Sequence, residues 1–306
     1  YLDVSTNTQP LSEYIYDLDS NSKNLLKKQE YNNYDINNYT DERIWAIAED
    51  GTKIPISVIY KKSTEKSKDT PLYIESYGAY GDGQYPDFNE MYLPLLDRGF
   101  IVAYAHVRGG DELGVDWYNK GRQLHKKNTF TDFISCTEHL INLGYTSKKN
   151  IVAYGASAGG LLMGAIANMR PDLYKTIILD APFVDVINTM NDPTLPLTTG
   201  EYIEWGNPKE KKYFDYMLSY SPYDNVKKQD YPNMLFLTGM EDEQVGFWEP
   251  LKMVAKLRKM KTDENLLLIR VDGTGHYSAG FFGNNDHFAY VYSFIFKTFG
   301  IDRSYK

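Results

Sequence analysis

The sequence contains a single cysteine, Cys136, among its 306 residues. One thiol cannot form a disulfide within the chain, and it cannot build a zinc cluster that needs several cysteines. The histidines and carboxylates show no spacing that is typical of a metal site. We therefore expect that the protein needs neither a metal nor another cofactor.

Long apolar runs and an excess of basic residues are absent as well. The longest apolar stretches, such as residues 289–296, are broken by Ser and Tyr and fall short of the roughly 18–20 residues of a membrane span. Lys and Arg number 33 against 41 Asp and Glu, which gives a net charge of −8. Because phosphate binding needs a basic surface, we expect no nucleic-acid partner, and the apolar pattern predicts no membrane insertion.

The composition is that of a globular protein. Hydrophobic residues make up 42% and charged residues 24% of the chain, which is long enough to bury a core in one large domain or two smaller ones. Nothing at the start is typical of a secretion signal, so we expect a cytoplasmic protein in a reducing compartment. The chain begins with Tyr1 rather than Met, from which we expect a longer protein, and the sequence leaves the oligomeric state open.

Residues 1–39 differ in pattern from the rest of the chain. Short stretches with Tyr, Leu and Ile alternate there with Asn, Ser and Lys turns, which predicts a few short antiparallel strands. A hairpin is predicted next, with strands at residues 43–48 and 53–60. The Asp50-Gly51 pair between them supplies the positive φ that a tight hairpin turn requires.

From residue 70 onward, short apolar runs alternate with helical patterns. This alternation predicts a mostly parallel sheet with helices on both faces, in which an active site lies at the carboxyl ends of the strands. The predicted strands are residues 72–77, 100–106, 150–154, 176–179, 233–238 and 266–271. The predicted long helices are residues 128–143, with an N-cap within Asn128–Thr129 and Gly144 as the end, 247–260 and 287–299.

A G-x-S-x-G motif, Gly155-Ala-Ser-Ala-Gly159, lies between a predicted strand and a predicted helix. This context is that of the nucleophile elbow of α/β-hydrolases, in which the serine, here Ser157, lies on a strained turn. Side chains at positions 155 and 159 would collide with the neighbouring strand and helix. The helix dipole points at Ser157, so we predict a nucleophile there; the alternative is a glycine-rich turn that only packs.

A serine nucleophile needs a base, and in α/β-hydrolases an acid and then a histidine follow the serine in the chain. Only His276 and His287 follow Ser157 by enough chain. His276 lies in a glycine-rich loop after the last predicted strand, whereas His287 begins a helix and is expected at the surface. The acid should follow the penultimate strand, where spacing alone leaves Asp242 and Glu241 as alternatives.

Several longer blocks make the sequence recognisable. They are residues 108–114 (RGGDELG), 155–162 (GASAGGLL), 182–185 (PFVD), 197–201 (LTTGE), 204–208 (EWGNP), 220–225 (YSPYDN) and 248–250 (WEP). On these blocks the chain, from about Trp45 to Ile301, resembles the prolyl oligopeptidase family of serine peptidases, and within it oligopeptidase B. So many blocks do not agree by chance.

The resemblance implies a two-part organisation. Residues 40–306 are expected to form an α/β-hydrolase peptidase domain. Residues 1–39 are expected to be the terminal strands of a β-propeller and a linker. The rest of that propeller, which belongs to the same protein and restricts the family's substrates to short peptides, is then absent from this chain.

The resemblance also implies the catalytic residues. The family's triad falls on Ser157, Asp242 and His276, which decides between the two candidate acids. Its oxyanion hole falls on the hydroxyl of Tyr77 and the backbone N–H of Ala158. Tyr77 lies at the carboxyl end of a predicted strand, which is where such a group is needed.

The specificity pocket departs from the oligopeptidase B pattern. Two glutamates hold the basic side chain at the cleaved position in that group; here Glu201 matches the first and Ile203 replaces the second, with Glu204 displaced by one residue. A further acidic pair binds the next basic residue, and of it only Asp87 remains because Tyr85 replaces the other carboxylate. An apolar side chain offers no acceptor to a guanidinium, so we expect a weakened preference for Arg and Lys.

These residues together predict a serine oligopeptidase that cleaves short peptides through an acyl-enzyme. An esterase or thioesterase on the same scaffold is one alternative, because the diminished acidic pocket leaves room for other substrates. The alternative of another class is a non-catalytic α/β-hydrolase fold that serves as an interaction module. The intact triad argues against that last reading.

Overall fold

A computed structural model of the chain describes residues 1–276 and 285–301. Its strands are β1 (Leu2–Val4), β2 (Ser12–Asp17), β3 (Ser22–Lys28), β4 (Tyr39–Ile47), β5 (Lys53–Lys61), β6 (Leu72–Glu75), β7 (Ile101–Ala105), β8 (Ile151–Ala156), β9 (Thr176–Asp180), β10 (Asn233–Gly239) and β11 (Leu267–Asp272). Its α-helices are α1 (Leu93–Leu96), α2 (Val115–Asn119), α3 (Lys127–Asn142), α4 (Ala158–Met169), α5 (Val186–Asn191), α6 (Tyr202–Trp205), α7 (Lys211–Leu218), α8 (Trp248–Met260) and α9 (Asn285–Phe299).

The larger sheet has the strand order β11-β10-β9-β8-β6-β7-β5-β4. Strands β6 to β11 run parallel to one another, and β5 joins β7 antiparallel at one side of them. The predicted hairpin is β4 and β5, and Gly51 in its turn has a φ of +82°. The prediction of a mostly parallel sheet is therefore confirmed.

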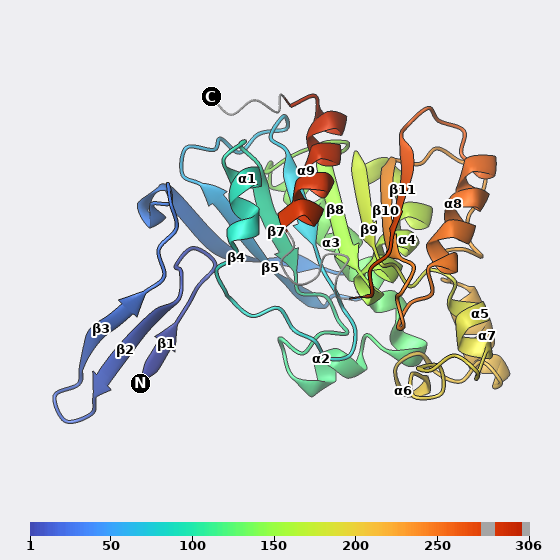
Figure 1. The fold of residues 1–306 in the computed structure, drawn as a ribbon, viewed down its shortest axis with the longest axis horizontal. Helices are drawn as coiled ribbons and strands as arrows, with labels where there is room; N and C mark the ends of the chain where they lie inside the picture. Colours follow the sequence, from blue (N-terminus) through green and yellow to red (C-terminus); the bar gives the residue numbers. More distant parts are fainter. Residues whose placement is uncertain (277–284, 302–306) are drawn as a thin grey trace.

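Helices cover both faces of this sheet (Figure 1). Strands β8 and β9 alternate their side chains between two buried clusters, as a sheet covered on both faces requires. One cluster includes Phe133 of α3, Leu161 of α4 and Met253 of α8, and the other includes Leu95 of α1 and Ile295 of α9. This is the layered α/β-hydrolase architecture.

The start of α3 differs from the prediction. The helix begins at Lys127 and no side chain caps it, so the predicted N-cap within Asn128–Thr129 is wrong. Thr129 is instead fully buried, and its hydroxyl donates to the carbonyl of Arg108 at 2.6 Å. The threonine therefore ties the loop after β7 to the helix, while Gly144, with a φ of +77°, ends the helix as predicted.

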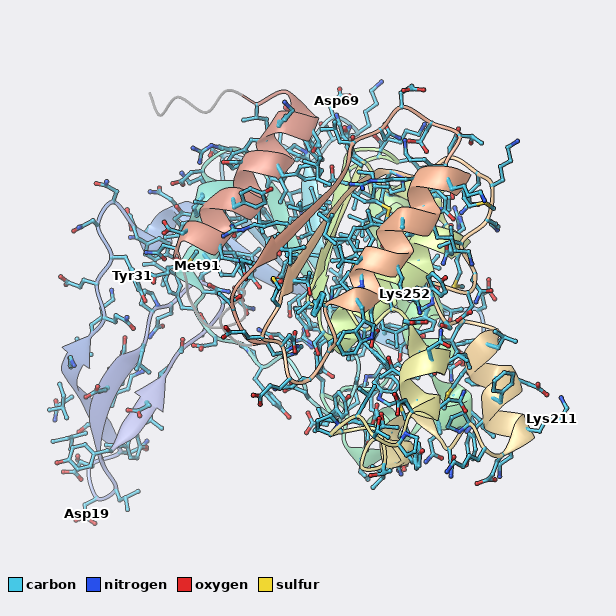
Figure 2. All side chains as sticks on the ribbon, turned by 45° about the vertical axis from the view of Figure 1, so that its right-hand side comes forward. Asp19, Tyr31, Asp69, Met91, Lys211 and Lys252 are labelled. Carbon is cyan, nitrogen blue, oxygen red and sulfur yellow. The ribbon has the colours of Figure 1, made fainter. Side chains whose placement is uncertain are left out.

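The smaller sheet, β1-β2-β3, is antiparallel and separate from the larger one. The short antiparallel strands predicted at the start of the chain are thus present. Figures 1 and 2 show this sheet projecting from the side of the main body, with Asp19 at the tip of its β2–β3 hairpin. Every side chain of β3 is exposed, so this sheet has no core of its own on that strand.

The fold brings three loops to the same edge of the larger sheet. Ser157 follows β8, Asp242 follows β10 and His276 follows β11, and these strands are parallel. Their carboxyl ends therefore meet at one edge, where ligands bind in open α/β sheets. Within the described ranges, no helix has both the length and the apolar character needed to cross a membrane.

Candidate active site

Ser157 lies on a strained turn between β8 and α4. Its backbone φ of 55° and ψ of −115° fall in a region that residues other than glycine rarely adopt. The Ser157 N–H donates to the carbonyl of Asp180 at 2.8 Å, and the Ser157 carbonyl accepts from the N–H of Phe183 at 3.1 Å. The surrounding main chain thus holds the strained residue on both sides.

Three glycines allow the main chain to close around this turn. A Cβ on Gly155 would lie 2.3 Å from the carbonyl oxygen of Gly159, and one on Gly159 would lie 2.7 Å from that of Ser76. A Cβ on Gly160 would lie 2.5 Å from the Cβ of Pro182. Atoms cannot approach so closely, which agrees with the steric reason inferred from the sequence motif.

His276 and Asp242 form a close pair. The Nδ1 atom of His276 lies 2.7 Å from Oδ2 of Asp242, and the Asp242 Oδ1 atom accepts the N–H groups of Gln244 at 2.9 Å and Val245 at 2.8 Å. The Asp242 side chain is completely buried, whereas Glu241 is exposed. The carboxylate that meets the imidazole is therefore Asp242, and its position is set by the loop's own main chain.

Tyr77 and Ala158 lie next to the serine. Burial raises the pKa of the Tyr77 phenol above its usual value, an effect partly opposed by a hydrogen bond with Ser157. The phenol therefore stays protonated at neutral pH and can donate a hydrogen bond. Ala158 is the first residue of α4, whose first intrahelical bond runs from Leu161 back to Ser157, so first-turn N–H groups have no acceptor within the helix.

A cavity of about 900 Å³ opens at this edge of the sheet. Ser157, Ala158, Tyr77 and Asp242 all line it. Other parts of its wall are apolar or aromatic and come from the segments that follow β9 and β10: they include Phe183, Met190 of α5, Trp205 of α6 and Trp248 of α8. The size and the mixed wall are those of a site for a small organic ligand or a short segment of peptide.

One carboxylate in this wall, that of Glu201, has a fixed orientation. Its Oε2 atom accepts the Tyr80 hydroxyl at 2.7 Å and the indole N–H of Trp205 at 3.0 Å. No hydrogen bond to its Oε1 atom occurs within the described part of the chain. A negative charge held in a largely apolar wall is suited to a cationic group of a ligand.

The other predicted specificity residues lie elsewhere. Ile203 is 66% exposed, and its carbonyl accepts the side chains of Gln123 at 3.0 Å and Arg122 at 3.5 Å. Tyr85 is also exposed and donates to Asp111 at 2.6 Å. Neither these two residues nor Asp87 is among those that line the 900 Å³ cavity.

Glu204 and Lys126 support this wall. The sequence analysis gave Lys126 no role and placed Glu204 one residue away from the second carboxylate of the pocket. Glu204 is buried and accepts the Tyr118 hydroxyl at 2.6 Å and the Tyr80 N–H at 3.2 Å, so it positions Tyr80. Lys126 is fully buried, which lowers its pKa to about 8, and its ammonium lies 5.0 Å from the ring centre of Trp205. The sequence signals for Glu204 were its place in the EWGNP block and its offset by one residue from the second carboxylate of the pocket.

Glu249 supports the opposite side of the cavity. Its side chain is buried and accepts the N–H groups of Val184 and Asp185, both at 2.9 Å, and the hydroxyl of Thr189 at 2.6 Å. Thr189 lines the cavity. Burial raises the pKa of Glu249 to about 7, because removal from water outweighs these three hydrogen bonds.

Two further histidines are buried away from water. His287 was expected at the surface, and this is wrong: its side chain is 6% exposed and lies 2.8 Å from Asp180, because the first turn of α9 packs on the end of β9. His106 is buried between Ser57 at 2.8 Å and Glu112 at 3.1 Å. Burial lowers the pKa of His106 below its usual value.

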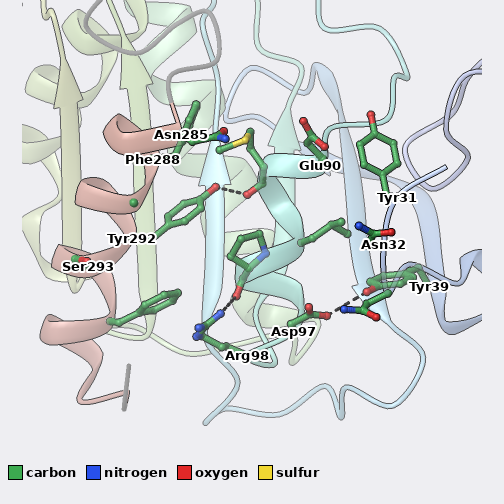
Figure 3. A pocket seen from close by; sticks show the side chains of 16 residues that line it. Tyr31, Asn32, Tyr39, Glu90, Asp97, Arg98, Asn285, Phe288, Tyr292 and Ser293 are labelled. Atoms are coloured by element: carbon green, nitrogen blue, oxygen red, sulfur yellow. Dashed lines mark hydrogen bonds between the residues drawn. The ribbon is translucent and has the colours of Figure 1, made fainter. Parts of the chain in front are cut away.

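A second cavity of about 660 Å³ lies between α1, α9 and the segment before β4 (Figure 3). Tyr292 reaches across it to the main chain of Met91, and Tyr39 contacts Asp97 at 3.1 Å. The residues that line it do not include Ser157, Asp242 or His276. The described residues also contain no cluster of three or more His, Cys, Asp or Glu that could hold a metal ion.

Comparison with known proteins places the chain in a family. A model of the prolyl oligopeptidase family matches residues 86–302. The chain belongs to this family. Dipeptidyl aminopeptidase BI of Pseudoxanthomonas mexicana is 45% identical over 297 residues, which are 96% of this chain and 41% of that protein. Protease 2 of Moraxella lacunata is 44% identical over 89% of this chain and 40% of that protein.

Solved structures agree with this assignment. Oligopeptidase B from Leishmania major superimposes with a TM-score of 0.90 at 45% identity, over 97% of this chain and 42% of that one. Oligopeptidase B from Trypanosoma brucei gives 0.92 at 44% identity, over 99% and 43%. The resemblance and the α/β-hydrolase fold are confirmed. The chain spans about two fifths of the length of the relatives that it matches.

Glu249 should make stability depend on pH. Its folded-state pKa of about 7 exceeds the ordinary 4.5, so its contribution is fully present below about pH 4.5 and is lost as the pH rises through 7. We expect wild-type protein to lose up to about 3 kcal/mol of unfolding free energy between pH 4.5 and 7.5 relative to Glu249→Gln. Urea unfolding at several pH values measures this difference. Glu264→Gln, at an exposed carboxylate, is the control, and parallel curves for Glu249→Gln and wild type would contradict the prediction.

Proposed function

We propose that the protein is a serine peptidase that cleaves short peptides, with Ser157, His276 and Asp242 as its triad. The observation that carries the proposal is the 2.7 Å contact between His276 and Asp242 at the sheet edge where Ser157 occupies the nucleophile elbow. Membership of the prolyl oligopeptidase family supports the same reaction. Asp242 engages Nδ1 of the imidazole, and Nε2 is the nitrogen to which we assign proton transfer.

The reaction follows from these roles. Nε2 of His276 takes the proton of the Ser157 hydroxyl as its oxygen attacks the scissile carbonyl carbon, and the carbonyl electron pair moves onto oxygen. When the tetrahedral intermediate collapses, the C–N bond breaks and His276 gives its proton to the leaving amine. Water then attacks the acyl-enzyme in the same way and releases the acid. Tyr77 and the Ala158 N–H stabilise the negative oxygen in both steps.

The proposed preference is for a basic residue at the cleaved position, weakened relative to a site with two carboxylates. Glu201 supports this preference, because Tyr80 and Trp205 fix its charge in the cavity wall. The similarity to oligopeptidase B supports it as well. Ile203, Tyr85 and Asp87 remain sequence-based assignments for the rest of the substrate path.

The proposal extends to the organisation of the whole protein. The relatives are more than twice as long as this chain, and β1-β2-β3 forms a separate projecting sheet. We assign this sheet to the last strands of a β-propeller whose remainder lies outside the chain and covers the site. The buried, unpaired Cys136 is compatible with the cytoplasm, where we place the protein.

Replacing the nucleophile is the direct test. Ser157→Ala should lower kcat for a fluorogenic arginyl peptide by about four orders of magnitude or more, because no other group forms the acyl-enzyme. Ser219→Ala, at an exposed serine outside the cavity, should keep wild-type turnover. Near-normal turnover by Ser157→Ala would end the peptidase proposal.

The same assay separates the alternative functions. An esterase would show a much higher kcat/KM for a p-nitrophenyl ester than for the matched arginyl amide. A non-catalytic interaction module would fold normally and yet fail to react with a fluorophosphonate probe. The proposed peptidase reacts with the probe at Ser157 and cleaves the amide.

Tyr77→Phe should lower kcat by about 10²–10³ with little change in KM, because the lost hydroxyl contacts the oxyanion rather than the bound substrate. The measurement is steady-state kinetics on the same peptide. Tyr216→Phe is the matched control, since its partly buried hydroxyl contacts the Lys127 N–H outside the cavity. A rate for Tyr77→Phe within about threefold of wild type would remove Tyr77 from the oxyanion hole.

Glu201→Gln should lower kcat/KM for arginyl substrates by about ten- to hundredfold and leave a substrate with a neutral residue at that position nearly unchanged. Ile203→Glu should raise the arginine preference by less than about threefold, because an exposed charge is screened by solvent. Both are read from a peptide library that varies the cleaved residue. An equal loss on neutral substrates would contradict the first expectation, and a tenfold gain for Ile203→Glu would instead support its sequence-based assignment.

A further inference from the structure

A second buried aspartate–histidine pair lies beneath the nucleophile elbow. Nε2 of His287 is 2.8 Å from Oδ2 of Asp180, and the two side chains are only 6% and 3% exposed. Among the residues that the structure describes, neither Nε2 of His287 nor Oδ1 of Asp180 has a hydrogen-bond partner. A buried carboxylate with an unsatisfied oxygen depends on a nearby cationic or polar group.

Asp180 holds the strand that carries the nucleophile. It is the last residue of β9, is paired with Ala156 of β8, and accepts the Ser157 N–H at 2.8 Å through its carbonyl. Its side chain also accepts the Tyr154 hydroxyl at 3.0 Å. Asp180 therefore binds β8 and the elbow through both its main chain and its side chain.

The chain after Asp180 returns to the elbow. Ala181 has a φ of +40°, and its N–H donates to the carbonyl of Leu237 in β10 at 2.8 Å. Two residues later the Phe183 N–H donates to the carbonyl of Ser157. A shift of Asp180 would therefore move the hydrogen-bond partners on both sides of Ser157.

His287 belongs to the helix that follows the proposed base. It is the third residue of α9 and comes eleven positions after His276. Val291 and Ile295 of the same helix pack in the cluster that also contains Val152 of β8. The Asp180–His287 pair therefore connects β9, the neighbour of β8 in the sheet, to α9, the helix that follows His276 in the chain.

We propose that Asp180 and His287 are positioning residues for the reaction. Their contact fixes the first turn of α9 on the end of β9. The end of β9 in turn holds the main chain of Ser157 at the position that the reaction with His276 requires. The inference rests on the proposed function, since it concerns the same serine and histidine. Small displacements of reacting groups cost large factors in rate.

The same two elements offer a matched control. At their other ends, the hydroxyls of Thr176 in β9 and Thr298 in α9 lie 2.7 Å apart. Thr298→Val removes a polar contact between β9 and α9 far from the elbow. A role in general stability predicts similar effects at both ends, whereas positioning predicts an effect on Ser157 only at the Asp180–His287 end.

The test compares His287→Leu, His287→Gln, Asp180→Asn and Thr298→Val in the full chain. We expect His287→Leu and Asp180→Asn to lower kcat about ten- to hundredfold at nearly constant KM, and Thr298→Val to stay within about twofold of wild type. His287→Gln keeps a polar side-chain donor and should recover a large part of the rate. If His287→Leu folds poorly, the comparison of His287→Gln with Thr298→Val tests the proposal instead.

Two readouts make the result independent of peptide cleavage. The rate of fluorophosphonate labelling reports Ser157 directly, and hydrogen exchange of the segment that contains Ser157 reports its N–H bond to Asp180. Both should be perturbed by His287→Leu and not by Thr298→Val, even if the substrate proposed above is wrong. Unchanged labelling and exchange in folded His287→Leu, or an equal effect of Thr298→Val, would overturn the positioning role.

Discussion

The close approach of main chain around residue 157 is the constraint on which the rest of the site depends. The strand β8 enters the turn and α4 leaves it within distances that exclude a Cβ on Gly155, Gly159 and Gly160. Such packing forces the serine into its unusual backbone conformation and projects it from the sheet edge. The hydrogen bonds that the Ser157 N–H donates to Asp180 and that the Ser157 carbonyl accepts from Phe183 then keep the strained turn closed.

Buried carboxylates hold the loops around this turn. Glu249 gathers two main-chain N–H groups and a hydroxyl on one side of the cavity, and Glu204 fixes Tyr80 on the other. Asp242 is held by the N–H groups of its own loop. Loops cannot be positioned by apolar packing alone, because their main-chain groups need partners. The ionisable residues supply these partners, and for Glu249 the cost is an elevated pKa.

The sequence predicted those features of the fold and the site that depend on residues close together in the chain. Apolar runs, the Asp50-Gly51 turn and the glycines of the elbow predicted the sheet and the place of Ser157, because each depends on neighbours in the chain. The burial of His287 could not be seen, since its partner Asp180 is more than one hundred positions away. The contact of Glu204 with Tyr118, which lies 86 positions away, could not be seen for the same reason. The side chain of Ile203 faces solvent because α6 is a single turn whose orientation follows from packing of Trp205.

The arrangement around Glu201 has a consequence for how a charge is recognised there. Both hydrogen bonds that Tyr80 and Trp205 donate fall on Oε2, so in the proposed binding site Oε1 is the acceptor for a ligand. A guanidinium gains its advantage over an ammonium by matching two acceptors at once with its planar fork. A site with a single open acceptor instead offers a point of negative charge. In the proposed enzyme, lysine and arginine side chains should then be discriminated far less than in a pocket that presents a complete carboxylate.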